Sequence, residues 1–510
     1  MREPTTAGDT VPTAVVRPLR TRRRSFFADA LQSTAAQAAT ALLNVASLAI
    51  ISRRLGEDDL GLYTLERRAC ALIQPFVLLG VTVATPRFIA VALGRVAEAH
   101  RSYAVTGGVI VAGMAAVIAA VIAAWPHAVA AAAFGDPGST DLALALAGFV
   151  VAAALYQIVY SIFRGYLRMG RANALELATI GAIPAAVAIA GPTDFVAFMW
   201  SLTAAMLCAT VLAAASAARR RRSSRQGSWR PAWSRARELL AYGLPRTPGD
   251  FAVIAPFALA PIAVVHFADP AQAGYASVVL STLNLVSVVA GPLGVLLLPY
   301  VAEEVGRRTV QTRRTWVRLA EATLDVALGL AALLFLGSRF VVLIWFPGVP
   351  AHVVAAQQVV ALGIPGYVFY LVFRSYLDAI DVRPLSSVAT VAGLLSLAVA
   401  LPLLLISPLP SAALAASAAV AISVTAMGAV TWRLVARRLP ETLEAQALIA
   451  PALAAAAIIA SSFAVSDAGS GILAGALILA TLAYGGLLAY LRRPWLRELI
   501  AMLRVKESAV

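Results

Sequence analysis

Uncharged apolar stretches of about 20 residues recur along the whole chain, and they restrict the fold more than any other feature. A helix of that length spans about 30 Å of hydrocarbon. Inside a bilayer, backbone polar groups must be hydrogen-bonded within the protein, which leaves helices and closed barrels as spanning structures. The alternating segments of an outer-membrane barrel are not seen. With 60% hydrophobic and 13% charged residues, the sequence predicts an all-α polytopic membrane protein.

Fourteen transmembrane helices are predicted from these stretches, with both chain ends on the same side of the membrane. The predicted spans are 29–53, 62–86, 103–125, 141–163, 172–191, 194–216, 239–266, 273–300, 319–346, 352–378, 385–406, 410–433, 445–464 and 471–491.

Arginine is confined mostly to alternate loops between these spans. The loop 217–237 alone carries eight arginines, whereas the loops WPHAVAAAAFGDPGST, GPTD, HFADPAQA, FPGVPAH, SPLP and SDAGSG contain no Lys or Arg. Positive loops stay inside, so both termini are expected in the cytoplasm. The net charge of +15 is thereby explained by topology and by anionic lipid headgroups, and no nucleic-acid partner is expected. Arginine-rich, lysine-poor composition indicates a bacterium, and hence its inner (plasma) membrane.

Two short matches indicate an internal repeat. Gly61 and Tyr63, with Pro86 at the end of the span, correspond to Gly274-Tyr275 and Pro299, about 212 residues later. Phe163-Arg-Gly-Tyr-Leu and Phe373-Arg-Ser-Tyr-Leu are 210 residues apart. Parallel repeats of six helices with a site between them are a transporter architecture. The expected domains are a basic tail (1–28), an N-lobe (29–216), an Arg-rich linker (217–237), a C-lobe (238–436), two further helices (437–492) and a basic tail (493–510).

The sequence excludes several kinds of chemistry. The motif GxxxxGK[ST] cannot occur, since Lys506 is the only lysine and stands near the C-terminus. The outer loops are too short to carry an enzyme's active site, so we expect neither an enzyme nor a cofactor. Cys70 and Cys208 lie in apolar runs without a CxxC or histidine companion, so no disulfide and no metal site are expected.

The stretch YGLPRTPGDF, at the start of the seventh span, is unusual for a membrane helix. An ionisable side chain at a helix centre costs roughly 2.5–3.5 kcal/mol on insertion scales. Arg246 and Asp250 are four residues apart and could pair on one face. Pro245, Pro248 and Gly249 weaken the helix, which is tolerated where it faces protein or a wet cavity. We therefore predict that Arg246 lines a translocation cavity and that Asp250 orients it, the alternative being a pair that only fixes helix packing.

Further polar residues lie within the predicted spans. Three consecutive residues, Glu66, Arg67 and Arg68, cover about 200° of a helix and cannot all face one direction. Snorkelling to headgroups and facing a cavity are both open for them. A polar stripe follows the first span, and a set of charged residues lies at the inner mouth, where positive-inside anchoring is the alternative. The stripe consists of Gln32, Gln37 and Asn44, and the inner set of Arg164, Arg374 and Asp378. Glu321 and Asp325, near a helix end, are expected to be structural or interfacial.

The stretch ISRRLGEDDLGLYTLERRACALIQPFVLLGVTVATPRFIA resembles the N-terminal signature of polysaccharide-export flippases. ELLAYGLPRTPGDF, followed by AGYASVVLSTLNLVSVVAGPLGVLLLPYVAE, resembles the start of their second lobe. These flippases belong to the multidrug/oligosaccharidyl-lipid/polysaccharide exporter superfamily, and the resemblance covers nearly the whole chain.

This resemblance implies a flippase that moves a polyprenyl-pyrophosphate-linked oligosaccharide to the outer leaflet by alternating access. It implies a cationic cavity lined by helices one, two, seven and eight, with the residues Gln37, Asn44, Arg67, Arg68, Arg246, Asp250 and Asn284. Glu66, next to Arg67 in the second span, is also a candidate cavity residue. The implied partners are the lipid-linked oligosaccharide, the lipid bilayer, and a glycan polymerase or glycosyltransferases of the same pathway. Two alternatives remain open: a lipid II flippase, although such flippases carry arginines in span one, and a cation-coupled drug exporter.

Overall fold

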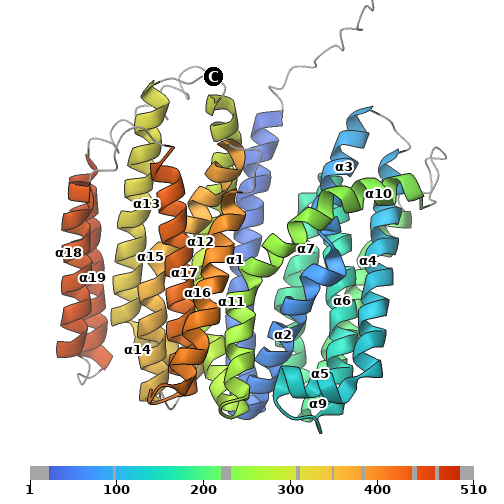
Figure 1. The fold of residues 1–510 in the computed structure, drawn as a ribbon, viewed down its shortest axis with the longest axis horizontal. Helices are drawn as coiled ribbons and strands as arrows, with labels where there is room; N and C mark the ends of the chain where they lie inside the picture. The colour runs from blue at the N-terminus through green and yellow to red at the C-terminus, as the bar shows by residue number, and fades with distance from the viewer. Residues whose placement is uncertain are drawn as a thin grey trace, which may run out of the picture.

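The computed structural model describes residues 22–95, 99–219, 231–305, 310–346, 348, 350–380, 385–438, 445–465 and 470–493. All the regular secondary structure in these ranges is helical. Most helices run roughly parallel to one another from one face of the molecule to the other, as expected for a membrane protein (Figure 1). Much of the two predicted basic tails and of the Arg-rich linker lies outside the described residues.

The helices of the first half come from residues 22–219, and a π-helical turn, η2 (Leu177–Ala182), joins two of them. Their bounds are α1 Arg22–Arg54, α2 Glu57–Leu78, α3 Val81–Arg95, α4 Ala99–Ala124, α5 Pro126–Phe134, α6 Thr140–Gly165, α7 Met169–Glu176, α8 Ile183–Ala190 and α9 Phe195–Arg219.

The helices of the second half begin after the gap in the described residues at 220–230, and a 3-10 turn, η3 (Leu244–Arg246), follows the first of them. Their bounds are α10 Trp233–Gly243, α11 Thr247–Val265, α12 Pro270–Val305, α13 Val310–Leu336, α14 Ser338–Trp345, α15 Ala351–Ile380, α16 Leu385–Ile406, α17 Ala412–Ala436, α18 Ala445–Ala464 and α19 Ser470–Leu491.

The described part of the chain contains 12 helical segments long and apolar enough to cross a membrane. The number becomes 13 when α2 and α3, which meet at a 48° bend, count as one span. Of the predicted fourteen, the span at 445–464 is shorter: its apolar helix covers Leu448–Ala464. The prediction of a multi-pass, all-helical membrane protein is confirmed.

Two short helices, α5 and α14, were not predicted as separate elements. The first lies in a predicted outer loop, and the second breaks the predicted span 319–346 after Leu336. They begin at Pro126 and Ser338, which are 212 residues apart, the same spacing as the repeated Gly-Tyr motifs. Both follow a long helix in corresponding positions of the two halves, so they extend the internal repeat beyond what the motifs revealed.

The second span bends where two residues adopt left-handed backbone. Leu79 has φ 48° and ends α2, and Gly80 has φ 65°. A side chain at Gly80 would also overlap the backbone of Gly243, where α10 ends. The bend therefore needs glycine both for its conformation and for the close approach. It brings the break in the second span against the break that precedes α11.

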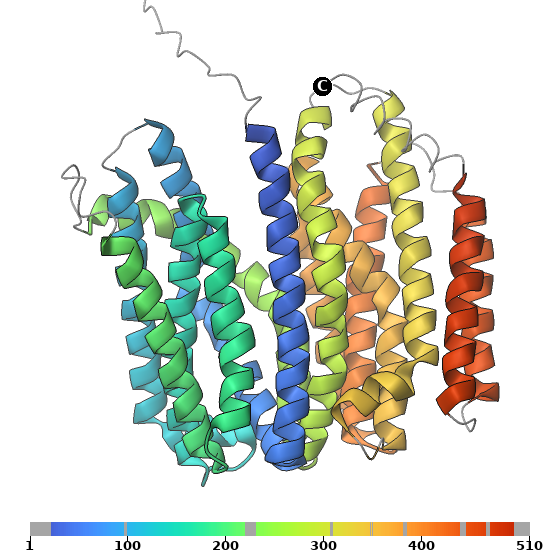
Figure 2. The same ribbon diagram turned by 180° about the vertical axis from the view of Figure 1, so that it is seen from behind.

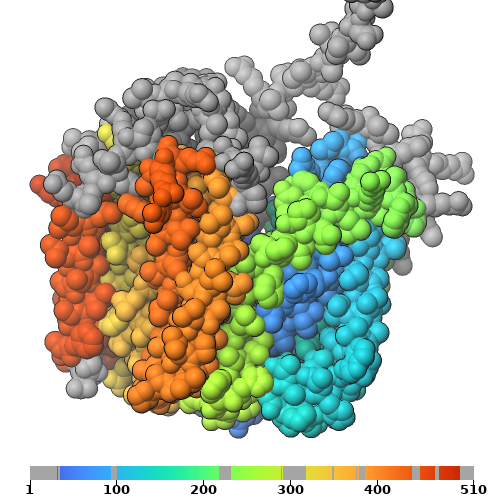
Figure 3. Space-filling model, viewed as in Figure 1, coloured from blue at the N-terminus to red at the C-terminus, as the bar shows by residue number. Residues whose placement is uncertain are grey.

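The two halves stand side by side. They meet through α1 and α2 of the first half and α11 and α12 of the second. Figure 2 shows α1 in the middle, with helices of the first half on one side and those of the second half, apart from α10, on the other. Helix α2 packs against both α11 and α12, which makes it the main contact of the first half with the second. Helix α10 lies across α3 and α4 at the surface (Figure 3), burying Ala236, Leu239 and Gly243.

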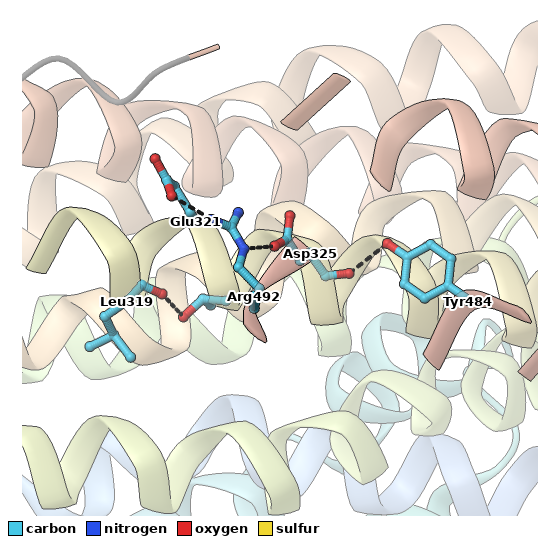
Figure 4. Close-up of polar contacts among 6 residues, drawn as sticks. Leu319, Glu321, Asp325, Tyr484 and Arg492 are labelled. Carbon is cyan, nitrogen blue, oxygen red and sulfur yellow. Dashed lines mark hydrogen bonds and ion pairs between the residues drawn. The ribbon is translucent and has the colours of Figure 1, made fainter. Parts of the chain in front are cut away.

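The last helix is attached to α13 by an ion pair. Arg492, directly after α19, donates to Glu321 Oε2 and Asp325 Oδ2, both at 2.7 Å (Figure 4). Tyr484 donates to the Asp325 carbonyl oxygen, also at 2.7 Å. Asp325 is fully buried and Glu321 nearly so. The expectation of a structural role for these carboxylates agrees with this arrangement.

Candidate functional site

Two consecutive arginines of α2 reach to two different helices. Nη1 of Arg67 donates to Oδ1 of Asn44 on α1 at 2.7 Å, and its guanidinium lies 5.5 Å from the centroid of the Tyr63 ring. Nη2 of Arg68 donates to the carbonyl oxygen of Ser277 on α12 at 3.0 Å. Adjacent residues of a helix are about 100° apart, so one faces α1 and the other α12. The partners of both guanidinium groups in these contacts are neutral.

A cavity of about 130 Å³ lies where these three helices meet. Its lining includes two arginines and two asparagines, and the helices α1, α2 and α12 each contribute to it. Its lining residues are Asn44, Leu48, Thr64, Arg67, Arg68, Ala71, Ser281 and Asn284. Four predicted site residues, Asn44, Arg67, Arg68 and Asn284, therefore lie on one cavity, and both arginines line it. None of the residues in this lining is acidic.

Glu66 is not part of this cavity, contrary to the prediction. Its exposed fraction is 0%, and neither carboxylate oxygen has a hydrogen-bond partner among the described residues. Cys70 and Gln74 lie one and two turns after Glu66, on the same side of α2. Gln74 donates to the Val150 carbonyl oxygen of α6, so this side faces the first half. Glu66 thus points into the interior of the first half, which follows from the angle that separates it from Arg67 and Arg68.

Gln37 lies two helical turns from Asn44 along α1 and is half-buried. It is absent from the cavity lining, which on α1 consists of Asn44 and Leu48. Its role as a substrate contact stays a prediction.

Arg246 and Asp250 lie at the predicted break in the seventh span, but they do not form the predicted ion pair. Arg246 is exposed, and its Nη1 donates to the Tyr242 carbonyl oxygen at 2.9 Å. Its guanidinium stacks on the Tyr242 ring, 3.8 Å from the centroid. No ion pair within 4 Å joins Arg246 and Asp250, both of which are described. The Arg246 guanidinium is directed back by one turn to Tyr242 and not forward to Asp250.

The carboxylate of Asp250 lies within electrostatic reach of two arginines, Arg246 and Arg374. Helices α11 and α15 also meet at Phe257 and Tyr367, whose ring centroids are 5.5 Å apart. Asp250 and Arg374 are each seven residues from this contact, toward the same end of the two antiparallel helices. The structure thus brings together Asp250, Arg246 and Arg374, which were predicted as two separate groups.

The other residues predicted at the inner mouth are less closely placed. Arg164 is exposed at the end of α6, with its guanidinium 5.7 Å from the Tyr160 ring centroid. The side chain of Asp378 lies outside the described residues. No group of three or more His, Cys, Asp or Glu residues in the described ranges is arranged to hold a metal ion.

The two halves are in close contact at the ends of α2 and α12 that the arginine pattern predicts to be outer; we call these the outer ends. A side chain at Gly61 would overlap the Pro270 carbonyl group, and one at Gly274 would place its Cβ 2.9 Å from Cα of Gly61. The Tyr275 hydroxyl donates to the Glu57 carboxylate across the same junction. The backbones approach closely because both positions are glycine.

Sequence reasoning missed several of these contacts. Ser277, Ser281 and Thr64 carry no charge and do not stand out in an apolar helix. Gly61, Gly274 and Tyr275 were found as repeated motifs, but a repeat does not show that its two copies touch each other. Their alignment in opposite halves is the signal that could have suggested it.

Residues 26–304 match the family of polysaccharide biosynthesis proteins. A search of curated proteins finds no significant match. Among solved structures, the lipid II flippase MurJ in an inward closed conformation has a TM-score of 0.68 at 13% identity, covering 92% of this chain and 100% of MurJ.

A second kind of solved structure has the same fold. A multidrug resistance MATE family transporter of the MOP superfamily, in its inward-facing conformation, has a TM-score of 0.62 at 12% identity. The match covers 80% of this chain and 98% of the transporter. The outward-facing conformation of such a transporter has a TM-score of 0.55, also at 12% identity, covering 80% and 94%. Such low identities establish the fold alone. With more than half of its residues matched to one family, the chain belongs to the polysaccharide biosynthesis protein family, and its fold is that of MATE and MurJ transporters.

Proposed function

We propose that this protein is a flippase that moves a polyprenyl-pyrophosphate-linked oligosaccharide from the inner to the outer leaflet of a bacterial plasma membrane. The observation that carries the proposal is the cavity between α1, α2 and α12, which holds Arg67 and Arg68 and no carboxylate. Family membership places the chain in polysaccharide biosynthesis, and this cavity supplies the chemistry that such a substrate requires.

The two guanidinium groups suit a pyrophosphate. A guanidinium presents its N–H donors in a planar fork that matches phosphate oxygens, and it holds its charge in a membrane interior. Burying such a charge is costly, and the neutral partners Asn44 and Ser277 leave both positive charges uncompensated. An anionic ligand would offset that cost. Arg67 and Arg68 are therefore proposed to bind the pyrophosphate, with Asn44 and Asn284 as hydrogen-bonding neighbours.

Closure of the outer ends supports an alternating-access cycle. Contacts between the halves involve α2, α11 and α12, and the outer junction includes the glycine pair Gly61 and Gly274. Helix α3, the inner part of the same span, packs on α4 and α6 of its own half and meets the second half through α10, which crosses the surface. A cavity closed outward in this way receives its substrate from the inner leaflet. Moving an anion outward is then assisted by an inside-negative potential, by about 2.3 kcal/mol per charge per 100 mV.

The proposal extends to the membrane topology and to the route by which the substrate enters. We propose fourteen spans in two six-helix lobes with two appended helices, and both termini in the cytoplasm. The inner-mouth residues Arg246, Arg374 and Arg164 are proposed to attract the pyrophosphate before it reaches the cavity. A polymerase or glycosyltransferases of the same pathway would act on the lipid-linked oligosaccharide before or after it moves.

The first test measures binding of farnesyl pyrophosphate to the purified full-length protein in lipid nanodiscs. The double variant Arg67→Gln/Arg68→Gln is expected to bind it about 100-fold more weakly, since two charge-assisted contacts are lost. Arg54→Gln is the matched control, because Arg54 also donates to carbonyl oxygens, those of Ala188 and Gly191, but lies outside the cavity. Equal binding by the double variant and the control would refute the proposal.

A second assay tests transport itself. Cells that depend on this protein for surface polysaccharide should lose it with the double variant and keep it with Arg54→Gln, at equal protein levels. Altered drug resistance with unchanged polysaccharide would support a drug exporter instead. A cavity with two arginines and no acidic lining does not favour a cationic drug.

A lipid II flippase is the second candidate, since the fold matches MurJ over that whole chain. Lipid II also carries a pyrophosphate, so the same cavity would bind it. Rescue of cells that lack their lipid II flippase would favour this candidate, whereas rescue of surface polysaccharide would favour the first.

A further inference from the structure

A second cavity, of about 370 Å³, lies on the outer side of the second half. It is formed by the turn between α11 and α12, residues 267–272, and by the α16–α17 connection with its flanking residues, 404–415. It shares no residue with the cavity of Arg67 and Arg68. We propose that this outer cavity, hereafter the outer pocket, binds uncharged sugar residues through their hydroxyl groups.

The polar groups of the outer pocket suit hydroxyls, which both donate and accept hydrogen bonds. Asp269 is held at the rim, where its Oδ1 accepts from the backbone N–H of Gln272 at 2.8 Å. Ser411 Oγ accepts from the Leu414 N–H at 3.1 Å, which leaves its hydroxyl hydrogen available to donate. Ser407 Oγ, on the same lining, donates to the Leu404 carbonyl oxygen at 2.6 Å and can accept from a ligand hydroxyl.

Gln272 supplies an independent indication of a missing ligand. Its side-chain oxygen is shielded from water and accepts no hydrogen bond from the described residues. A buried acceptor without a donor is unfavourable, because it has lost its hydrogen bond to water. A ligand hydroxyl in the outer pocket would supply the donor after a small rotation of the Gln272 side chain.

An aromatic ring completes the set of groups. Phe267 lines the outer pocket and has an exposed fraction of 58%. The face of a sugar ring that carries C–H groups packs on the electron-rich face of an aromatic ring. The outer pocket thus offers hydrogen-bond acceptors, hydroxyl groups and an exposed aromatic face. A sugar can use all three, through its hydroxyls and through the C–H face of its ring.

Charge selects an uncharged sugar over a lipid headgroup. The one ionisable side chain in the lining is the carboxylate of Asp269, which repels phosphate. The two loops that form the outer pocket, HFADPAQA and SPLP, contain no Lys or Arg. An anionic headgroup would therefore meet a negative charge and no cation.

The position of the outer pocket connects it to transport. Pro270, within the same turn, contacts Gly61 where the outer ends close, and Tyr275 reaches Glu57 five residues later. Opening of the outer ends would have to move this turn. That the bound sugar belongs to the translocated lipid rests on the proposed function: the oligosaccharide would reach the outer pocket as the cavity opens outward.

The binding test uses maltotriose, chitotriose and isomaltotriose as probes, with the full-length protein in nanodiscs free of maltoside detergent. Saturation-transfer NMR should show contact with at least one of the three. Phe267→Ala and Asp269→Asn/Gln272→Leu should each weaken binding at least about 10-fold. The matched controls are Trp125→Ala and Asp136→Asn, an exposed aromatic residue and a turn carboxylate at the outer side of the first half. Absence of contact with all three sugars, or equal loss in the controls, would overturn the proposal.

Farnesyl pyrophosphate separates this proposal from the proposed function. The variants of the outer pocket should bind that probe as the natural protein does, since they leave Arg67 and Arg68 unchanged. Lost sugar binding with intact pyrophosphate binding supports the outer pocket. Failure of the Arg67→Gln/Arg68→Gln variant to weaken pyrophosphate binding would instead refute the proposed function and leave the sugar result standing.

Discussion

Half-buried arginines in two parts of this molecule have opposite electrostatic surroundings. Arg492, at the end of α19, lies 2.7 Å from each of two carboxylates, Glu321 and Asp325. Arg67 and Arg68 of α2 donate to an amide oxygen and a backbone carbonyl. The first arginine is neutralised by the protein, and the other two keep their charge while lining a cavity.

This difference separates a structural from a ligand-binding use of the same side chain. An arginine paired to two acids has no charge left for a ligand, and breaking the pair leaves uncompensated carboxylates. An arginine with neutral partners is oriented but keeps its positive charge. A phosphate that enters the cavity is therefore attracted by the whole charge of the guanidinium. The number of acidic partners, rather than depth in the membrane, indicates which arginine meets the substrate.

The largest expected effect is on stability, when the neutralised arginine is removed. Arg492→Gln leaves Glu321 and Asp325 without a cation and should lower the free energy of unfolding by about 3–5 kcal/mol. Steric trapping in bicelles measures that free energy directly. The triple variant Glu321→Gln/Asp325→Asn/Arg492→Gln is the control, and its stability should return most of the way to that of the natural protein. A triple variant as unstable as Arg492→Gln would show that charge compensation is not what Arg492 supplies.

The second prediction converts one kind of arginine into the other. Asn44→Asp places a carboxylate where an amide oxygen now lies 2.7 Å from Arg67. The new ion pair should weaken farnesyl pyrophosphate binding by about 30-fold, or about 2 kcal/mol, because Arg67 is then neutralised. Isothermal titration in nanodiscs measures the change.

Asn44→Ala is the control for Asn44→Asp, since it removes the hydrogen bond without adding charge. We expect a loss of about fivefold for it, the value of one hydrogen bond. If both variants weaken binding equally, orientation and not charge is what Asn44 provides.

Sequence reasoning succeeded where the signal was local. Spans could be predicted because each apolar stretch is long enough to cross the membrane, and the angle between neighbouring residues already showed that Glu66, Arg67 and Arg68 must diverge. Which of the three faces the cavity depended on α1 and α12, whose contacts are not local. The partners of Arg492 lie 167 and 171 residues away, and no spacing rule connects them. The bend at Leu79 was missed because leucine rarely adopts left-handed backbone.

Arg246 is the intermediate case, and it carries the smallest expected effect. Its guanidinium is exposed and has a carbonyl oxygen and an aromatic ring as partners, while Asp250 lies within electrostatic reach but not within 4 Å. An exposed charge is screened by water and salt, so its contribution is about 0–1 kcal/mol. Arg246→Ala should therefore lower the rate of pyrophosphate entry by about threefold and leave equilibrium binding in the cavity unchanged.

Salt dependence identifies the cause of that effect. Stopped-flow measurement of farnesyl pyrophosphate association should show the deficit of Arg246→Ala at low ionic strength and its disappearance near 1 M salt, where the Debye length is about 3 Å. Tyr242→Leu, which removes the ring beneath the guanidinium but keeps the charge, should retain most of the association rate. A salt-independent loss of affinity as large as that of Arg67→Gln/Arg68→Gln would instead place Arg246 in direct contact with the pyrophosphate. Arginines with neutral hydrogen-bond partners would then bind the substrate at two places, at the break that precedes α11 and on α2.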